Sequence, residues 1–236
     1  YLLEEGRSLL EAAEALAHTT QQVAKGWETR LRIGFNSLLP ADCLFDSVRE
    51  FYGLGVPFEV QLVEEVFAGS WDALQSRRID MIVGADQMSK PAGAFTTSPL
   101  GKMSFVYAAS PEHPLASAEQ PLTEADIAAF PAAVAADTSR SIPPGNAGIF
   151  RRQRTLTVSN IDQKIAIQKA GLAVGWLPEP RVRRLLETGE LKALKVHEPR
   201  QPIMLHLARH SEDQGKALMW FWERLTTSPT LSDWLE

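Results

Sequence analysis

The stretch RTLTVSNIDQKIAIQKAGLAVGWLPEP, residues 154–180, decides the fold class of this chain. Its pattern predicts a strand, a polar turn at Ser159 and Asn160, a helix that Gly171 stops, and a second apolar strand at 172–177. A β–helix–β unit this compact predicts strands that are covered on both faces. We expect its polar turn to face a crevice, because α/β sheets bind ligands beyond the carboxyl ends of their strands.

The same alternation continues on both sides of this stretch. Between residues 28 and 102 we predict strands at 31–35, 58–66 and 79–83, separated by helices at 41–52 and 70–77. From residue 103 onward we predict strands at 104–109, 132–136, 191–196 and 203–208, helices at 123–130, 182–187 and 215–226, and a mobile loop at 143–148. The order predicts an α/β protein with two Rossmann-like lobes, joined by two crossing strands with a cleft between them.

Local signals refine three of these helices. Leu44, Phe45, Val48 and Phe51 are expected on one buried face of the helix at 41–52. Ser70 is expected to cap the next helix, with Asp72 in its first turn. The helix at 123–130 is expected to be capped by Thr123, with Glu124 and Asp126 in its first turn.

The first segment, 1–25, predicts a separate helix. Leu2, Leu9, Leu16 and Val23 recur every seven residues along it. This repeat fits equally well an ordinary surface helix and a helix that pairs with a second chain. Because the chain starts inside the helical pattern, we expect it to be part of a longer protein.

Composition limits the function. The net charge is −5, with 44% hydrophobic and 22% charged residues, so the chain has the make-up of a soluble globular protein and lacks a basic patch for strong DNA binding. The apolar runs are too short to span a membrane, and residues 1–25 are too acidic for a signal peptide. The single Cys43 excludes an internal disulfide and favours a reducing compartment, with the cytoplasm as the default.

The motifs of common catalytic and metal sites are absent from the sequence. There is no CxxC, HExxH, GxSxG or P-loop, and Gly171 and Gly175 do not complete a dinucleotide fingerprint. His113 is interpreted as a turn residue and Cys43 as a small buried side chain. We therefore expect no catalytic residue, no metal and no cofactor.

Six further stretches stand out in order along the chain: LRIG with LP (31–34, 39–40), FEVQL with Glu64, Gly69 and Leu74 (58–62), RIDMIV (78–83), PEHPLA (111–116), LTEADI (122–127) and AGLAVGWLP (170–178). Taken in this order, they resemble the effector-binding domain of LysR-type transcriptional regulators. Two departures are Arg78, where the family usually has glycine, and the bulky Trp176, where it often has a small residue. Both make the effector harder to identify without affecting the expected fold.

The resemblance implies a type II periplasmic-binding-protein-like fold: a linker helix at 1–27, a first subdomain at 28–102 plus 203–236, and a second at 103–202. It implies an effector-sensing, non-enzymatic domain that forms a homo-dimer or homo-tetramer in the cytoplasm. DNA would be bound only through a helix-turn-helix module that precedes the linker helix. Under this resemblance, pairing becomes the favoured explanation of the first helix.

The candidate effector-binding residues lie at strand exits that face the predicted cleft. They are Asn36, Ser37, Leu38, Gly69, Ser70, Asp86, Asp137, Thr138, Ser139, Ser159, Asn160 and Trp176. For each Ser, Thr or Asn, capping or turn formation explains the residue equally well, and Phe67 and Trp71 are expected in the core or on the rim. The expected ligand is a small organic effector without high negative charge: a weak acid, a phenol or a neutral aromatic.

Two other classes share the predicted architecture. A periplasmic-type solute-binding protein would need an export signal. An enzyme on the same fold would need a convergent acid/base pair, for which Asp86 and Asp137 are the only candidates.

Overall fold

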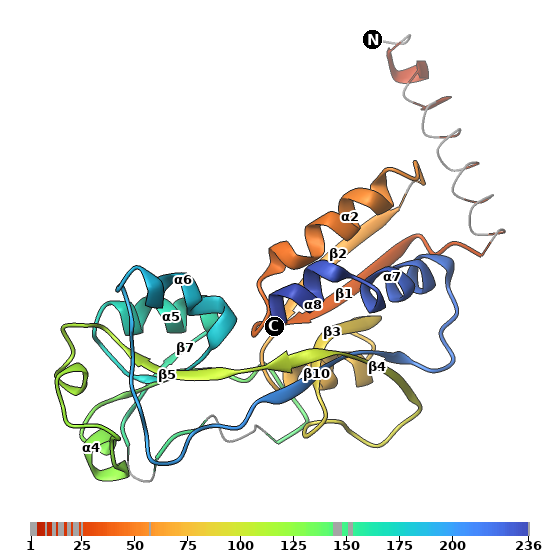
Figure 1. Cartoon of the computed structure of the whole chain (residues 1–236). Helices are drawn as coiled ribbons and strands as arrows, with labels where there is room; N and C mark the ends of the chain where they lie inside the picture. Colours follow the sequence, from red (N-terminus) through yellow and green to blue (C-terminus); the bar gives the residue numbers. More distant parts are fainter. Residues whose placement is uncertain are drawn as a thin grey trace.

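Two lobes, each built around β-strands, are joined by two crossing segments in the computed structural model (Figure 1). The structure describes residues 4–7, 9–10, 13, 17, 20, 24, 26–56, 58–143, 148–150 and 153–235. Residues 144–147, at the centre of the predicted mobile loop, and Leu2, Leu16 and Val23 of the heptad repeat lie outside the described residues.

The first lobe contains a five-stranded sheet with the order β2-β1-β3-β10-β4. Its strands are β1 (Arg30–Asn36), β2 (Glu59–Glu65), β3 (Met81–Asp86), β4 (Phe95–Met103) and β10 (Ile203–His210). β1 pairs in parallel with β2 and β3, whereas β10 runs antiparallel to β3 and β4. The predicted parallel β–α–β–α–β arrangement is therefore confirmed, and the carboxyl ends of β1 and β3 meet at one edge of the sheet.

Helices pack on both faces of this sheet. They are η1 (Ala41–Leu44), α2 (Phe45–Tyr52), α3 (Gly69–Gln75), α7 (Lys216–Thr226) and α8 (Pro229–Leu235). On one face, the buried ring of Phe51 contacts the rings of Phe58, Trp220 and Phe221, with centroids 5.1, 5.2 and 4.9 Å away. Full burial of such a side chain contributes about 1.5–3 kcal/mol, so this aromatic cluster holds α2 and α7 against the sheet.

The second lobe is built from shorter strands. β8 (Gly175–Pro178), β5 (Phe105–Ala109) and β9 (Lys192–Ala193) form one sheet, and β6 (Ala132–Ala135) and β7 (Thr155–Val158) form a parallel pair. A single bridge between Ala132 and Val174 connects the two groups. The helical elements are η2 (Pro114–Ala116), α4 (Glu124–Ala128), α5 (Ile161–Lys169) and α6 (Glu179–Glu187).

The crossings bring the lobes close together. Only Ser104 separates β4 from β5, so one almost continuous ribbon passes from the first lobe into the second (Figure 1). The chain returns through residues 194–202, which lead into β10. The predicted two-lobed architecture with two crossings is confirmed; the first crossing is the β4–β5 ribbon, and the second is irregular until β10 begins at Ile203.

Several local predictions are also confirmed. Thr123 caps α4 in a capping box with Asp126. Asn160 caps α5, and Gly171 follows that helix with a φ of +69°, a left-handed conformation in which glycine avoids the steric cost of a Cβ. Cys43 is buried, and its thiol donates to the carbonyl of a residue one turn earlier.

Three local predictions are wrong. Ser70 does not cap α3: the N-cap is Ala68, without a side-chain hydrogen bond, and Ser70 lies inside the first turn. Phe45 is 49% exposed, because the turn before α2 is a 3₁₀ helix and its tighter winding changes which side chains face inward. β7 is not covered on both faces: it is an edge strand whose alternate residues are exposed.

Two elements were missed and two are shorter than predicted. Neither β4 nor α8 was predicted. The strand expected at 172–177 begins at Gly175, and the one expected at 191–196 is reduced to β9 and an isolated bridge at Val196.

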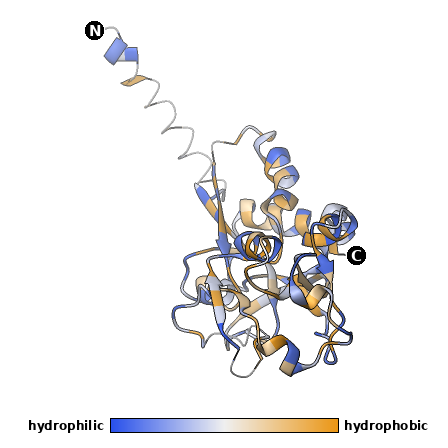
Figure 2. Cartoon of the chain, turned by 90° about the vertical axis from the view of Figure 1, so that its left-hand side faces the viewer, coloured by the Kyte–Doolittle hydropathy of each residue, from blue (hydrophilic) through white to orange (hydrophobic). Residues whose placement is uncertain are grey.

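The described part of the first segment lies away from both lobes. Residues 4–7 are helical and stand apart from the rest of the chain, as both views show (Figures 1 and 2). Leu9 of the heptad repeat is 71% exposed, and the adjacent Leu10 is similarly open. These exposed leucines leave the pairing of this segment as a prediction.

Candidate functional site

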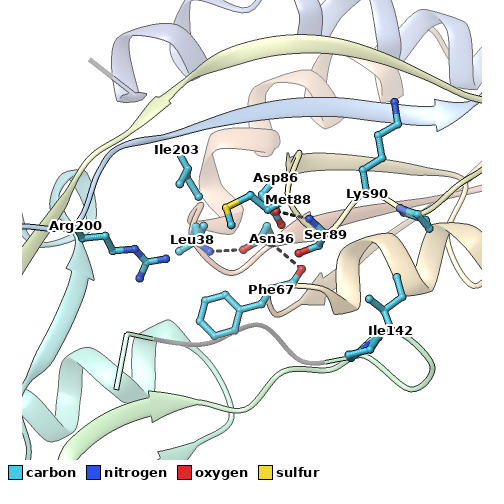
Figure 3. Close-up of a pocket in the computed structure, with 12 residues that line it drawn as sticks. Asn36, Leu38, Phe67, Asp86, Met88, Ser89, Lys90, Ile142, Arg200 and Ile203 are labelled. Carbon is cyan, nitrogen blue, oxygen red and sulfur yellow. Dashed lines mark hydrogen bonds between the residues drawn. The ribbon is translucent and has the colours of Figure 1, made fainter. Parts of the chain in front are cut away.

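A pocket of about 480 Å³ opens where β1 and β3 end, beside the returning crossing segment (Figure 3). Its wall contains polar, charged and apolar side chains from several elements: Asn36, Leu38, Phe67, Asp86, Met88, Ser89, Lys90, Pro91, Ile142, Pro143, Arg200 and Ile203. A volume of this size accommodates a small organic molecule.

Asn36, the last residue of β1, organises the floor of the pocket. Its Nδ2 donates to Ser70 Oγ at 3.1 Å and to the Phe67 carbonyl at 3.4 Å, while its Oδ1 accepts from the Leu38 amide at 3.1 Å. The side chain is almost fully buried, so these bonds satisfy polar groups that would otherwise be costly. Asn36 thereby links the exits of β1 and β2 to the start of α3.

Phe67 places an aromatic ring in the pocket. Its backbone has a φ of +48°, a left-handed conformation that is uncommon for a bulky residue. The ring projects away from the Asn36 contact into the pocket (Figure 3). A strained backbone of this kind costs on the order of 1–3 kcal/mol and is often retained where a side chain must be aimed at a ligand.

The two ends of the pocket carry opposite charges. Arg200 comes from the returning crossing segment, and its guanidinium lies 3.9 Å from the centroid of the Phe105 ring. Burial lowers the pKa of Arg200, and the nearby Asp86 carboxylate opposes that shift. At the other end, Asp86 Oδ1 accepts from the Ser89 amide at 2.8 Å, and the Asp86 carbonyl accepts from Trp71 Nε1 at 2.6 Å.

A polar network between the lobes lies beside the pocket and involves the strand exit after β6. The Asp137 carboxylate accepts from the Gly69 amide at 3.0 Å and the Ala68 amide at 3.3 Å, so it caps α3 from the other lobe. Thr138 Oγ1 accepts from the Val66 amide at 2.9 Å and also bonds the buried Glu65 carboxylate. These groups join the lobes and are already occupied within the protein.

Asp72 extends this network one turn further along α3. Its carboxylate accepts from the amides of Arg140 and Ser141 at 3.2 and 3.0 Å, and it pairs with Arg78 at 2.8 Å. Arg78 also pairs with Glu65 at 2.7 Å. The hydrogen bonds from Ser141 and Arg78 hold the pKa of Asp72 below its usual value, against the opposing effect of burial. Arg78, the departure from glycine noted in the sequence, thus has a structural role between the lobes.

The predicted site residues fall into three groups. Asn36, Leu38 and Asp86 line the pocket. Gly69, Ser70, Asp137, Thr138 and Ser139 lie around the N-terminus of α3, where Ser139 donates to the Ile142 carbonyl at 2.6 Å. Ser37, Ser159, Asn160 and Trp176 lie outside the pocket wall.

Each member of the third group has a different environment. Ser37 is buried, and its carbonyl accepts from Arg181 of the second lobe at 2.8 Å. Ser159 is exposed, and Asn160 donates to Glu64 of the first lobe at 3.1 Å. Trp176 is buried in the core of the second lobe against Tyr107, with ring centroids 5.3 Å apart. The polar turn of the 154–180 stretch therefore faces the other lobe but not the pocket.

Sequence reasoning missed most of the charged and apolar pocket wall. Phe67 was expected in the core or on the rim; it packs against the core of the first lobe and lines the pocket. Met88, Ser89 and Lys90 begin two residues after the end of β3 at Asp86, so a longer strand exit would have included them. Arg200 carries no local signal, because it lies in an irregular segment that only the fold brings to the pocket.

The described residues contain neither a metal-binding cluster nor a membrane-spanning helix. No group of three or more His, Cys, Asp or Glu side chains within those residues is placed to hold a metal ion. Among the helices of the described ranges, none is long and apolar enough to cross a membrane.

Comparison with known proteins gives consistent results. The family model of the LysR substrate binding domain matches residues 24–229. The chain is 31% identical over 219 residues to the probable HTH-type transcriptional regulator YhaJ of Escherichia coli, covering 93% of this chain and 73% of the relative.

Solved structures with similar folds include the C-terminal domains of a LysR family protein from Agrobacterium tumefaciens. That structure has a TM-score of 0.64 and 20% identity, with coverage of 88% of this chain and 97% of the other. Full-length LysG from Corynebacterium glutamicum with bound effector Arg has a TM-score of 0.65 and 18% identity, with coverage of 96% and 75%.

Proposed function

Because this chain belongs to the LysR substrate-binding domain family, we propose that the pocket beside Arg200 binds the small organic effector of a transcriptional regulator. The observation that carries this proposal is the pocket itself, which lies at strand ends and is lined by both lobe and crossing residues. Similar proteins are named as transcriptional regulators, and the similar LysG structure is described with a bound effector.

Asn36, Leu38 and Asp86 are the predicted site residues that we retain as direct effector contacts. Leu38, Phe67 and Ile203 supply apolar surface, and Asp86 and Arg200 supply charge. For Gly69, Ser70, Asp137, Thr138 and Ser139 we propose a role in shaping the adjacent lobe contact. We propose no direct effector contact for Ser37, Ser159, Asn160 or Trp176.

The effector would act by changing how the lobes are held together. The contacts between them include Asp137 with the start of α3, Asn160 with Glu64, and Arg181 with the Ser37 carbonyl. A ligand shifts such an equilibrium only through a difference in its affinity for the two arrangements. Arg200 would supply this difference in affinity. A ligand bound to Arg200 contacts the crossing segment as well as the first lobe, so its contacts depend on how the two are arranged.

Several wider properties follow as proposals from the family. The segment 1–27 serves as a linker helix for a homo-dimer or homo-tetramer, 28–102 with 203–236 form one subdomain, and 103–202 form the other. DNA is contacted through a helix-turn-helix module in the intact regulator, which works in the cytoplasm and catalyses no reaction. The exposed Leu9 and Leu10 support the pairing role of the first segment.

A bulky substitution that blocks the pocket tests the proposed site. Met88 lies at the mouth and is largely exposed, so Met88→Trp adds bulk there without disturbing the core. Calorimetry with a broad metabolite panel should identify a ligand of the unmodified protein, and the variant should bind it weakly and fail to respond in a promoter reporter. Met204→Trp, on β10 and outside the pocket wall, is the matched control. A normal response of the Met88 variant would place the effector elsewhere.

A further inference from the structure

A half-buried cation, Arg200, lines one end of the pocket, and a fully buried cation, Lys164, lies close enough to it to feel its charge. Lys164, on the inward face of α5, is 3% exposed, although lysine is among the residues least often found in a protein interior. Burial is the main cause that lowers the pKa of Lys164, to about 7, and the positive charge of Arg200 adds to the shift. Arg200 therefore lies near enough to Lys164 for the two charges to repel each other.

Neither cation has an acceptor in the described structure. Within the ranges that are described, no hydrogen bond or ion pair is formed by Lys164 Nζ or by the Arg200 guanidinium. The contact of Arg200 with the Phe105 ring is a cation–π interaction, which leaves the N–H groups at the edge of the guanidinium available. Buried charges are normally paired, so the buried Lys164 without an acceptor, beside the open edge of the Arg200 guanidinium, points to a place for an anion.

A third polar group adjoins Lys164. Gln168, one turn further along α5, is completely buried, and neither its Nε2 nor its Oε1 has a partner among the residues described. Both side chains converge on Gly175 of β8: a Cβ at that glycine would lie 3.5 Å from Gln168 Nε2 and 3.8 Å from Lys164 Cε. Buried polar groups without partners are uncommon in proteins, so the interior of the second lobe beside Lys164 has unused capacity for hydrogen bonding.

The other pocket residues indicate what kind of molecule would carry the anionic group. Leu38, Phe67 and Ile203 form an apolar wall between Arg200 and Asp86 (Figure 3). Lys90 also lines the pocket, but its ammonium group lies 5.9 Å from the centroid of the Trp71 ring, and its side chain extends away from Arg200 in the same view. Positive charge directed at the ligand therefore comes from the Arg200 end.

We propose that the effector is a small organic acid whose carboxylate is held by Arg200, with Lys164 as a second positive charge behind it, and whose apolar part lies along Phe67. This inference rests on the proposed effector-binding function and specifies its ligand class. It revises the expectation from the sequence, in which a weak acid, a phenol and a neutral aromatic were equally admissible. Arg200 and Lys164 favour the acid in its ionised form.

Matched acid and amide probes test this inference directly. Benzoate and benzamide have nearly the same shape, as do pentanoate and pentanamide, but only the acids carry a charge. Calorimetry at millimolar concentration should show the acids binding about tenfold or more tightly than their amides, because a hydrogen bond to a charged group is stronger than one between neutral groups. The preference should weaken at high salt.

Two variants test whether Arg200 and Lys164 cause the preference for the acid over the amide. Arg200→Gln keeps hydrogen-bonding capacity but removes the charge, and Lys164→Met keeps the length of the side chain. Each should reduce the acid-over-amide ratio by about tenfold, whereas the exposed Arg183→Gln on α6 should leave it unchanged. General damage to the fold would weaken acids and amides alike, so the ratio separates recognition from stability.

Three outcomes would overturn the inference: equal binding of amides and acids, an unchanged ratio in the Arg200 variant, or no binding of either acid. Each leaves the proposed function intact, because that is decided separately by the metabolite panel and the blocked pocket. If the Met88 variant binds and responds normally while the acid preference persists at Arg200, the proposed function of the pocket fails but the anion site stands.

Discussion

Replacing Lys164 by methionine should stabilise the ligand-free protein, and the gain should depend on pH. Methionine retains an unbranched chain of similar length but has no charge to desolvate. The Lys164 side chain is 3% exposed, and burial lowers its pKa, so its charged form opposes folding. Lys164→Met should therefore raise the free energy of unfolding, whereas most substitutions in a protein core lower it.

The size of the effect follows from the shift in pKa. Lowering the pKa of Lys164 from 10.5 to about 7 corresponds to at most about 5 kcal/mol at 1.36 kcal/mol per pKa unit. Because side chains relax around a buried charge, we expect Lys164→Met to raise the free energy of unfolding by about 2–4 kcal/mol at pH 6.

The pH dependence has a definite sign. The unfolded chain keeps the proton on Lys164 up to about pH 10.5, whereas the folded chain releases it near pH 7, so the unfolded state binds more protons between these values. Unmodified protein is therefore stabilised as the pH rises through this window. Between pH 6 and pH 8 the advantage of the variant should shrink by about 1 kcal/mol.

Urea unfolding at pH 6 and pH 8, followed by tryptophan fluorescence, measures both quantities. Lys169→Met on the same helix is the control: Lys169 is partly exposed and pairs with Glu190, so its replacement should change stability by less than about 1 kcal/mol at either pH. A Lys164 variant that is less stable than the unmodified protein at pH 6, or an advantage that does not shrink with pH, would refute the reasoning.

Three further predictions concern groups away from Lys164. Burial raises the pKa of Cys43 to about 12, so the native thiol should react with a disulfide reagent at pH 8 far more slowly than the unfolded thiol; equal rates would contradict its burial. Gly69→Ala would put a Cβ 1.8 Å from Thr138 Oγ1 and should lower the free energy of unfolding by about 1–3 kcal/mol in urea; a neutral result would mean that the lobe contact is not formed as described. Trp71→Phe removes the 2.6 Å hydrogen bond to the Asp86 carbonyl and should lower the melting temperature through a loss of about 1–2 kcal/mol, whereas an unchanged melting temperature would show that water replaces the bond.

Elements whose cause lies within a few residues could be predicted from the sequence. The Thr123 capping box joins residues three positions apart, and Gly171 ends α5 because glycine readily adopts the left-handed conformation needed there. The parallel strands of the first lobe followed from the alternation of apolar runs and helices. Ordered motifs along the chain then predicted the family, which the family model and relatives confirm.

Where distant segments compete for the same group, local signals gave the wrong answer. Serine is a common N-cap residue, so the sequence predicted that Ser70 caps α3. In the structure, the Asp137 carboxylate of the other lobe accepts from the amides at the start of α3, and Ser70 Oγ accepts from Asn36 instead. On α5, Lys164 and Gln168 are buried together with Ile161, which their polar character does not predict. Burial depends on what faces the helix, and that depends on the whole fold.

By itself the sequence determined the order of most strands and helices, because the repeating apolar pattern and the capping residues act over distances of a few residues along the chain; β4 and α8 were missed. Only the tertiary structure decided that Asp86 and Arg200 meet at the pocket and that Lys164 lies near Arg200. Arg200 lies in a segment without regular structure, Lys164 lies in a helix 36 positions earlier, and Asp86 ends a strand of the other lobe. Their approach follows from the crossing of two segments between the lobes, and no periodicity along the chain encodes the distance between side chains that the fold brings together.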